Sequence, residues 1–367
     1  MFKRATQALQ TQAKRPIKFG LSLSIPLAFA LALTSCSKLT PEQVFLESAN
    51  NQLIRPYYLD LTAETKKLSV SVEQHCRNEE HSETLKNQWR NTMVAWQKAQ
   101  AIKFGPLREH NLAWEYQFWP DKKNLVAKKL KPLLKADAPQ TLESLNKSSV
   151  VTHGLPAIEY LLFDEQADKY GDQNAQCSLA QVIANHLAKT SEQLNTQWLQ
   201  YESQLLNANT KNPEYPTQAH AVAVVIDSFL TQVENISNRK LTMALGLKIK
   251  GQRLNPYFLE SWRSQHSKEN LLANVSSVED LMNQGGLGMY LGQKGHATLA
   301  NNINKNLQDT RSAIEAMSAS LFEQLNQQQS QAAKDLQDHL LQLTQHFKTD
   351  IPTALNIQLG FNNNDGD

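Results

Sequence analysis

The sequence predicts an all-α protein with two pseudo-symmetric helical-bundle domains. Apolar residues recur every three or four positions over long stretches, strand signals are nearly absent, and the breaks between helical stretches are short. A polar stretch at residues 207–216 interrupts this periodicity near the middle of the chain. We therefore expect an N-terminal bundle in residues 36–206 and a C-terminal bundle in residues 217–367. The similar triplets Gln-Trp-Arg at 88–90 and Ser-Trp-Arg at 261–263 would then open comparable helices.

Residues 1–35 have the composition of a bacterial signal peptide. Basic residues without any acid precede an apolar run, Phe19 to Leu33, that is too short for an ordinary transmembrane helix. The run leads into Leu33-Thr34-Ser35-Cys36, which resembles the lipobox of bacterial lipoproteins. We expect cleavage before Cys36 and a lipid on its new N-terminus, which anchors the chain without spanning the membrane. A secreted protein with a free Cys36 is the alternative.

The residue after Cys36 and the charge balance indicate where the mature chain works. Ser37, not Asp, follows the cysteine, and resemblance to enterobacterial sorting rules then predicts the outer membrane of the cell envelope, facing the periplasm. The full chain has 37 basic and 35 acidic residues, and five of the basic ones precede Cys36, which leaves a mature formal charge of −3. We expect no nucleic-acid partner from so nearly neutral a chain.

Two cysteines, Cys76 and Cys177, remain after Cys36 is assigned to lipidation. An even pair in an oxidising compartment is most simply a disulfide. Its long loop predicts a stabilisation of about 3–4 kcal/mol in the loop-entropy description. A Cys/His metal site with His75 and His81 is the rival, although no second group of ligands surrounds Cys177.

The expected helices follow one another with recognisable starts and stops. Thr40-Pro41-Glu42 has the cap and proline of a helix start, and Leu85, Trp89 and Trp96 lie on one apolar stripe of the helix from Ser82. Polar residues 164–178 predict a surface loop, and glycines at 285–288 predict a turn. The expected helical stretches are 39–68, 82–103, 139–146, 154–163, 179–206, 219–243, 255–267, 299–325 and 330–347.

The stretch Val151 to Phe163 holds one carboxylate inside an apolar helix. Gly154 and Pro156 mark the helix start, because proline suits the first turn, where amide groups have no partner within the helix. Glu159 follows about one turn later. It either complements the positive end of the helix, worth about 0.3–1 kcal/mol, or is buried and must be paired, protonated or bound to a cation.

Gly-Leu-Pro-Ala-Ile-Glu-Tyr-Leu-Leu-Phe at 154–163 resembles the signature helix of the imelysin-like proteins. The family pattern G-x-H-x-x-E has a histidine where this chain has Pro156. Histidine and glutamate three residues apart share a helical face and can grip a metal ion, but proline offers no ligand, and His153 precedes the helix. Phe-Gly-Pro at 104–106, Phe-Trp-Pro-Asp at 118–121, E-x-x-R-S at 260–264 and the C-terminal tail extend the resemblance.

The resemblance implies two helical bundles with a site between them, and it selects the candidate residues. We expect a ligand at Glu159, Glu260, Arg263 and Ser264, with Glu115 in the lining, and any metal ion, iron or zinc, at Glu159. Glu260, Arg263 and Ser264 would lie one turn apart on a helix, although an internal Glu260–Arg263 pair is the plainer interpretation. Three further polar residues are candidates for the lining of the cleft: Arg108, Glu109 and Asp121.

Three functions remain open at this point. The resemblance and the lipobox favour a periplasm-facing lipoprotein in iron uptake, whose partners are the membrane, through its lipid, and iron or an iron-uptake component. A metallopeptidase is the second, because founding imelysins are classed as peptidases, but the sequence has no H-E-x-x-H helix and the motif histidine is Pro156. We therefore assign no catalytic residue. A structural envelope lipoprotein is the third.

Overall fold

The computed structural model describes residues 39–136, 138–247 and 253–360. The predicted signal peptide, the predicted lipidation site Cys36 and the last residues of the tail, 361–367, lie outside the described residues. Within these ranges the chain is helical and contains no strand, which confirms the all-α prediction. No helix in this part of the chain has the length and apolar character needed to cross a membrane.

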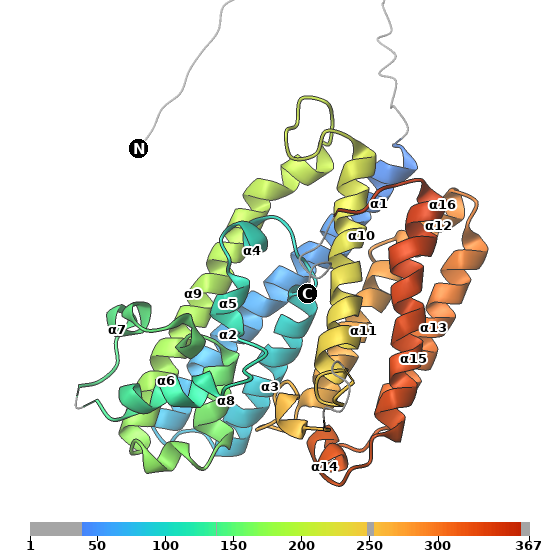
Figure 1. Cartoon of the computed structure of the whole chain (residues 1–367). Helices are drawn as coiled ribbons and strands as arrows, with labels where there is room; N and C mark the ends of the chain where they lie inside the picture. The colour runs from blue at the N-terminus through green and yellow to red at the C-terminus, as the bar shows by residue number, and fades with distance from the viewer. Residues whose placement is uncertain (1–38, 137, 248–252, 361–367) are drawn as a thin grey trace, which may run out of the picture. The chain divides into compact units, whose positions relative to one another are not determined.

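The helices, labelled as in Figure 1, are α1 Pro41–Ala49, α2 Arg55–Cys76, α3 Ser82–Ala99, α4 Pro106–Glu109, α5 Ala113–Tyr116, α6 Leu125–Leu134, α7 Leu142–Lys147, α8 Leu155–Phe163, α9 Gln173–Leu206, α10 Gln218–Asn235, α11 Ser267–Met282, α12 Leu287–Gln293, α13 Ala297–Glu315, α14 Leu321–Asn326, α15 Gln331–Gln345 and α16 Ile351–Leu355. Short π-helical stretches occupy Asn50–Ile54, Ile236–Leu241 and His346–Asp350, and 3₁₀ turns occupy Val150–Thr152, Ala167–Lys169 and Pro256–Phe258.

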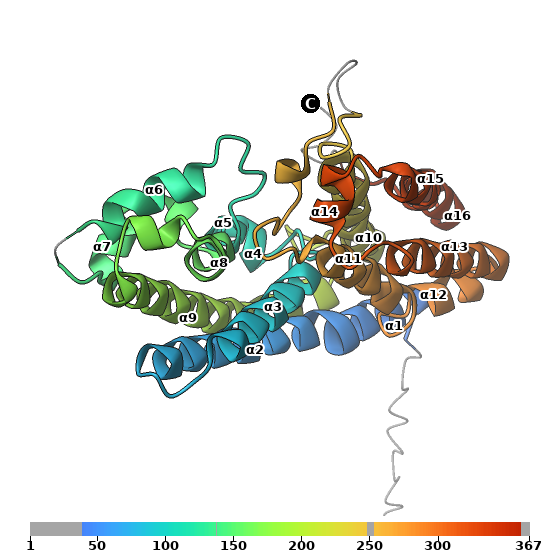
Figure 2. The same ribbon diagram turned by 90° about the horizontal axis from the view of Figure 1, so that it is seen from below.

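The first helices form a continuous rod, because the π-helical stretch Asn50–Ile54 joins α1 directly to α2. The Thr40 hydroxyl accepts a hydrogen bond from the Gln43 amide, and the Gln43 side chain accepts one from the Thr40 amide. This reciprocal cap satisfies amides that have no partner within the helix. Helix α2 packs along α3 and α9, as the view from below shows (Figure 2). Trp89, Trp96 and Trp198 are fully buried in this part of the core.

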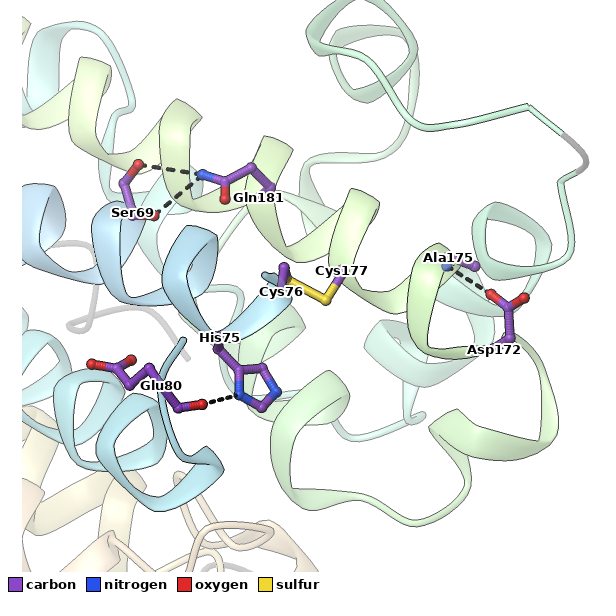
Figure 3. Close-up of a disulfide and its surroundings, with 8 residues drawn as sticks. All are labelled: Ser69, His75, Cys76, Glu80, Asp172, Ala175, Cys177 and Gln181. Carbon is purple, nitrogen blue, oxygen red and sulfur yellow. Dashed lines mark hydrogen bonds between the residues drawn. A yellow bond between two sulfur atoms is a disulfide. The ribbon is translucent and has the colours of Figure 1, made fainter. Parts of the chain in front are cut away.

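Helix α9 begins at Gln173, inside the stretch that the sequence predicts to be a loop up to residue 178. Asp172 is the reason, because its carboxylate accepts a hydrogen bond from the Ala175 amide at 2.9 Å and caps the helix. Close to this start, Cys177 of α9 forms a disulfide with Cys76, the last residue of α2 (Figure 3). The predicted disulfide is therefore confirmed.

The rival prediction of a Cys/His metal site is wrong, because both sulfur atoms belong to the disulfide. His75 turns away from it and places Nδ1 3.2 Å from the Glu80 carbonyl oxygen (Figure 3). The same face of the α2–α9 pair is held by Gln181, whose side-chain amide donates to the Ser69 carbonyl at 3.2 Å. The disulfide thus adds to a contact that the two helices already make along their length.

Helices α10 to α16, here called the second set, pack directly against helices α1 to α9, the first set. Helix α11 lies against both α3 and α13, and α1 contacts α10 and α12. A polar contact crosses this boundary, where Asp280 of α11 accepts hydrogen bonds from Tyr57 at 2.7 Å and Lys98 at 3.1 Å. Leu39 and the described residues after it belong to one compact unit. Residues 207–216 are the irregular link between α9 and α10, and a domain boundary there stays a prediction.

Two stretches differ from the predicted helices. Residues 260–265 form consecutive turns rather than a helix, because Ser261 and Gln265 have φ angles of 52° and 56°, which stop a right-handed helix. Trp262 therefore lies in a turn, whereas Trp89 lies in helix α3, so the two residues do not open comparable helices. The predicted helix 299–325 is also divided, since α13 ends at Glu315 and α14 begins at Leu321. The first difference matters for the site, because the E-x-x-R-S residues lie in those turns.

Candidate functional site

The start of α8 is pressed against the segment that follows α5. A Cβ atom placed on Gly154 would lie 2.4 Å from the Tyr116 carbonyl oxygen, so only glycine fits there. Pro156 occupies the first turn, as predicted. From the other side, the indole N–H of Trp89 on α3 donates to the Leu155 carbonyl at 3.0 Å. These contacts fix the direction of α8 and so the position of Glu159.

Glu159 is buried, with 3% of its surface exposed, which favours the second of its two predicted roles. One oxygen, Oε1, accepts hydrogen bonds from the backbone N–H and the hydroxyl of Ser264, at 2.9 and 2.8 Å. Burial raises the pKa of Glu159, although Arg263 and the Ser264 donors act in the opposite direction. The structure therefore brings Glu159 and Ser264 together across the boundary between the two sets of helices.

Glu260 is equally buried but has a different partner. The Lys240 ammonium, from the π-helical stretch after α10, donates to Glu260 Oε2 at 2.7 Å. Amide side chains satisfy the rest of the pair: Asn270 and Gln117 donate to Glu260, and Gln97 and Asn274 accept from Lys240. Burial lowers the pKa of Lys240, while Glu260 opposes that change. The internal Glu260–Arg263 pair is therefore not formed.

Arg263 binds to residues of the first set of helices. Its guanidinium donates to Asp164 at 2.8 Å and to Asn124 at 2.7 Å, and it lies 4.3 Å from the centre of the Trp262 ring. Beside it, a cavity of about 30 Å³ is lined by residues that include Pro156, Glu159 and Arg263. That volume has room for about one water molecule. This contact is a sealed interface, and it leaves no space for an organic ligand.

Glu115 lies apart from this contact, in a cluster with two histidines. Glu115 Oε2 is 2.7 Å from His153 Nδ1 and 2.9 Å from His186 Nε2. Hydrogen bonds from His153 and His186 lower the pKa of Glu115 to about 2. Burial lowers the pKa of His153, but Glu115 and the Leu145 carbonyl outweigh it and the net pKa is raised. The expected grouping of Glu115 with Glu159 is therefore not found.

A much larger cavity, of about 500 Å³, lies between residues 96–119 and residues 227–240. Four cationic side chains line it, Lys103, Arg108, Arg239 and Lys240, together with the acidic Asp227. Three tryptophans also contribute to the lining: Trp96, Trp114 and Trp119. Burial, then repulsion from Lys240 and Arg239, lowers the pKa of Lys103 to about 8. The volume is in the range of small-molecule sites.

Comparison with known proteins identifies the family. The Imelysin family model, of the peptidase M75 type, matches residues 54–347, which is most of the chain. The chain belongs to the imelysin family. It is 23% identical to iron-regulated protein A of Synechococcus elongatus over 273 residues, which cover 72% of this chain and 68% of that protein.

Two solved structures share the imelysin fold. An imelysin-like protein from Psychrobacter arcticum superposes with a TM-score of 0.75 and 21% identity, covering 88% of this chain and 99% of that one. A putative iron-regulated protein A precursor from Parabacteroides distasonis has a TM-score of 0.69 and 14% identity, covering 88% and 97%. At these identities the comparison establishes the fold.

The residues at the imelysin signature position do not fit a metal ion. Pro156 takes the histidine position, and Glu159 Oε1 is already used by Ser264. Glu260, the nearest candidate for a second carboxylate ligand, is paired with the Lys240 ammonium. A cation at Glu159 would therefore have one carboxylate and a cavity of about 30 Å³, far fewer donors than transition metals take in proteins.

Sequence reasoning placed some residues well and missed others. The structure does not gather the predicted lining residues in one cleft: Arg108 lines the large cavity, Asp121 lines the small one, and Glu109 lines neither. Lys240 and Lys103 were missed, because a single lysine at the end of an apolar helix has the pattern of a solvated residue. His186, which contacts Glu115, was not among the predicted site residues either. Its position on the apolar stripe of α9 was the available signal of a buried polar contact.

Proposed function

We propose that this imelysin is a lipid-anchored envelope protein in iron uptake that binds a small anionic ligand in its 500 Å³ cavity. The iron-related part is supported by the relative named iron-regulated protein A. The anchor is supported by the lipobox-like sequence ending at Cys36, and outer-membrane attachment facing the periplasm by Ser37. The ligand class is argued from the cavity itself.

The charge of the cavity lining is the observation on which this proposal depends. Lys103, Arg108, Arg239 and Lys240 contribute four positive charges, and two negative charges, Asp227 in the lining and Glu260 bonded to Lys240, offset part of them. A partly buried cation gains from an anionic partner, because the low local dielectric strengthens their attraction. The tryptophans add flat apolar and π surfaces, which suit an organic anion better than a bare inorganic one. We expect a ligand with several carboxylate or phenolate oxygens.

An anionic iron chelate as the ligand would agree both with the cationic cavity and with the proline at the position of the motif histidine. Hard oxygen donors of a small chelator hold ferric iron, so the protein needs to recognise only the negative charge and shape of the complex. No protein ligand to the metal is then required, which agrees with proline at position 156. The protein would then recognise the iron complex as an organic anion, without a bond between a side chain and the metal.

The test is a titration of the full-length chain in detergent with ferric citrate, followed by tryptophan fluorescence. Trp96, Trp114 and Trp119 line the cavity, so occupancy should change the emission. Lys103→Gln should weaken binding about 10-fold, since a charged hydrogen bond contributes about 1.5–3 kcal/mol. Lys129→Gln, at an exposed position of α6, is the matched control. Equal affinities of the two variants, or no saturable change, would refute the proposal.

Citrate without iron is the second arm of that titration. Binding of the chelate and not of citrate alone would support the iron-related role, and equal binding would reduce it to general recognition of carboxylates. Raising the salt concentration should weaken either interaction, because salt screens the attraction between the cationic lining and the anion.

The membrane anchor has its own test. Wild-type cells fed labelled palmitate should give a labelled, processed protein in the outer-membrane fraction. Cys36→Ser should leave an unlabelled precursor of lower mobility, because the lipid is attached at that residue. Label that persists in Cys36→Ser would contradict the anchor without affecting the proposed ligand.

A further inference from the structure

Glu115, His153 and His186 come together from three separate parts of the first set of helices. Glu115 is on α5, His153 follows the 3₁₀ turn Val150–Thr152, and His186 is in the middle of α9. Their ligand atoms all lie within 4.8 Å of one another. They line neither the large cavity nor the small cavity beside Glu159. The cluster is therefore distinct from the proposed anion site.

The contacts of His153 require a positive charge, either a proton or a metal ion, between its ring and Glu115. Nε2 lies 2.8 Å from the Leu145 carbonyl oxygen, and Nδ1 lies 2.7 Å from Glu115 Oε2. Both partners are acceptors, whereas a neutral imidazole has one N–H. The carbonyl uses the hydrogen of Nε2, so the lone pair of Nδ1 would face a carboxylate oxygen. Either a second proton or a metal ion must lie between them.

His186 adds a second nitrogen to the same place. Its Nε2 is 2.9 Å from Glu115 Oε2, the oxygen that already faces His153. One carboxylate oxygen thus lies between two imidazoles whose rings are 5.3 Å apart. Two imidazoles and one carboxylate form the three-ligand set of many catalytic zinc and non-haem iron sites.

The geometry points to a divalent transition-metal site formed by Glu115, His153 and His186. The Leu145 carbonyl would orient the His153 ring by accepting from Nε2, as backbone carbonyls commonly do for metal-binding histidines. Ligand atoms around a tetrahedral ion at about 2.1 Å lie about 3.4 Å apart, so a small rotation of the Glu115 carboxylate would open the position. Zn²⁺ and Fe²⁺ are the ions that suit these donors.

The cluster is both reachable and held in place. The side chains of Glu115 and His186 are 28% and 15% exposed, so an ion and its remaining waters can enter from solvent. The backbone next to His153 cannot move freely, because Gly154 is pressed against the Tyr116 carbonyl beside Glu115. Two of the three ligands are therefore fixed to each other by backbone packing, which favours a preformed site.

The competing explanation is a protonated His153 paired with Glu115, without a metal ion. The two differ in one measurable respect, since a structural ion pair binds no Co²⁺. The inference does not rest on the proposed anionic ligand. Lys103→Gln should impair only the anion, and loss of the histidines should impair only the metal ion.

The test is a Co²⁺ titration of the full-length chain, freed of metal by a chelator and kept in detergent, with visible absorption as the readout. Wild type should bind a stoichiometric amount with the intense bands of a low-coordinate nitrogen–oxygen site, and Zn²⁺ should displace it. His186→Gln and Glu115→Gln should each weaken binding at least about 10-fold. His110→Gln, at an exposed position, and Glu159→Gln should bind as wild type does.

Thermal unfolding should accompany each titration, because His153 and Glu115 also support local structure. His186→Gln is the deciding variant, since its side chain is partly exposed and the fold should tolerate it. Failure of folded wild-type protein to bind Co²⁺, or equal binding by folded His186→Gln, would overturn the site and leave the protonated pair. Loss of binding by Glu159→Gln would also overturn it, by placing the ion at the signature helix.

Discussion

Glu159 and Glu260 are both 3% exposed, yet the protein compensates their charges in different ways. Glu260 faces an ammonium, Lys240, within a network of amide side chains. Glu159 accepts only neutral donors, both from Ser264 and both on one oxygen. Burial raises the pKa of Glu159, and Arg263 and the Ser264 donors oppose that rise. Equal burial therefore does not imply equal chemistry, because one carboxylate is paired with an ammonium and the other accepts hydrogen bonds from neutral groups.

The two carboxylates also differ in what surrounds them. Glu260 lies behind the large cavity, since its partner Lys240 and its donor Gln117 both line that cavity. Glu159 faces a space of about 30 Å³. Glu260 is linked to the cavity lining through Lys240, whereas Glu159 joins two sets of helices through Ser264. Variants at each position should separate a charge role from a packing role.

Lys240→Met should give the largest effect. It removes the only cation bonded to Glu260 among the described residues and leaves a buried carboxylate unpaired, which costs about 3–5 kcal/mol. Urea unfolding of the two proteins measures the loss. Lys66→Met is the control, because Lys66 and Glu192 form an exposed pair worth about 0–1 kcal/mol.

The double variant Lys240→Met/Glu260→Gln sharpens this result. Removing both charges should recover more than half of the loss, since the penalty comes from the unpaired carboxylate rather than from the missing contact. A double variant as unstable as Lys240→Met would mean that packing of the lysine stem, not charge, dominates at this position.

Removing the disulfide should give the next largest effect. The bond joins residues that are 101 positions apart. Loop entropy alone gives about 4.7 kcal/mol for a loop of that length, and measured effects are typically about 2–4 kcal/mol, so we expect a loss of about 3–4 kcal/mol in Cys76→Ser/Cys177→Ser. Because neither cysteine contacts the carboxylates, the same loss should appear in the Lys240→Met background. Reductant added to wild type provides the control, as it should reproduce the double-serine curve. A strongly non-additive result would link the two regions.

Local patterns in the sequence were sufficient for the helices that have clear starts. The α3 stripe, the Pro156 start of α8 and the Thr40 cap all depend on neighbours within four residues, which a sequence displays directly. The turns at 260–265 were not predictable, because Ser261 and Gln265 adopt positive φ without the glycine or asparagine that usually signals it. Their conformation is imposed by distant packing.

The candidate site shows the same limit for side chains. The family pattern correctly brought Glu159 and Ser264 together, as partners 105 positions apart. It did not reveal that Lys240 would take Glu260, or that His153 and His186 would enclose Glu115, because those contacts join elements whose packing angle no single segment encodes. The cysteine pair was easier, since Cys76 and Cys177 were the two cysteines left once Cys36 was assigned to the predicted lipid anchor.

Glu159→Gln should have the smallest effect, within about 1 kcal/mol at neutral pH. The glutamine carbonyl oxygen can accept both hydrogen bonds from Ser264, and the small cavity has room for a water beside the new amide. Glu159→Ala should lose more, about 1–3 kcal/mol, because it leaves buried donors of Ser264 unsatisfied. Urea unfolding of both variants measures the difference.

The pH dependence of the unfolding free energy, measured for wild type and Glu159→Gln, is the sharper measurement. A carboxyl whose folded pKa is raised above its ordinary value of 4.5 binds its proton more tightly in the native state. Its contribution to wild-type stability is therefore complete below pH 4.5 and is lost as the pH rises through the folded pKa. Glutamine has no such loss, so the stability of Glu159→Gln relative to wild type should increase with pH. A relative stability that falls instead would show that the folded pKa of Glu159 is lowered, and would contradict the effect of burial.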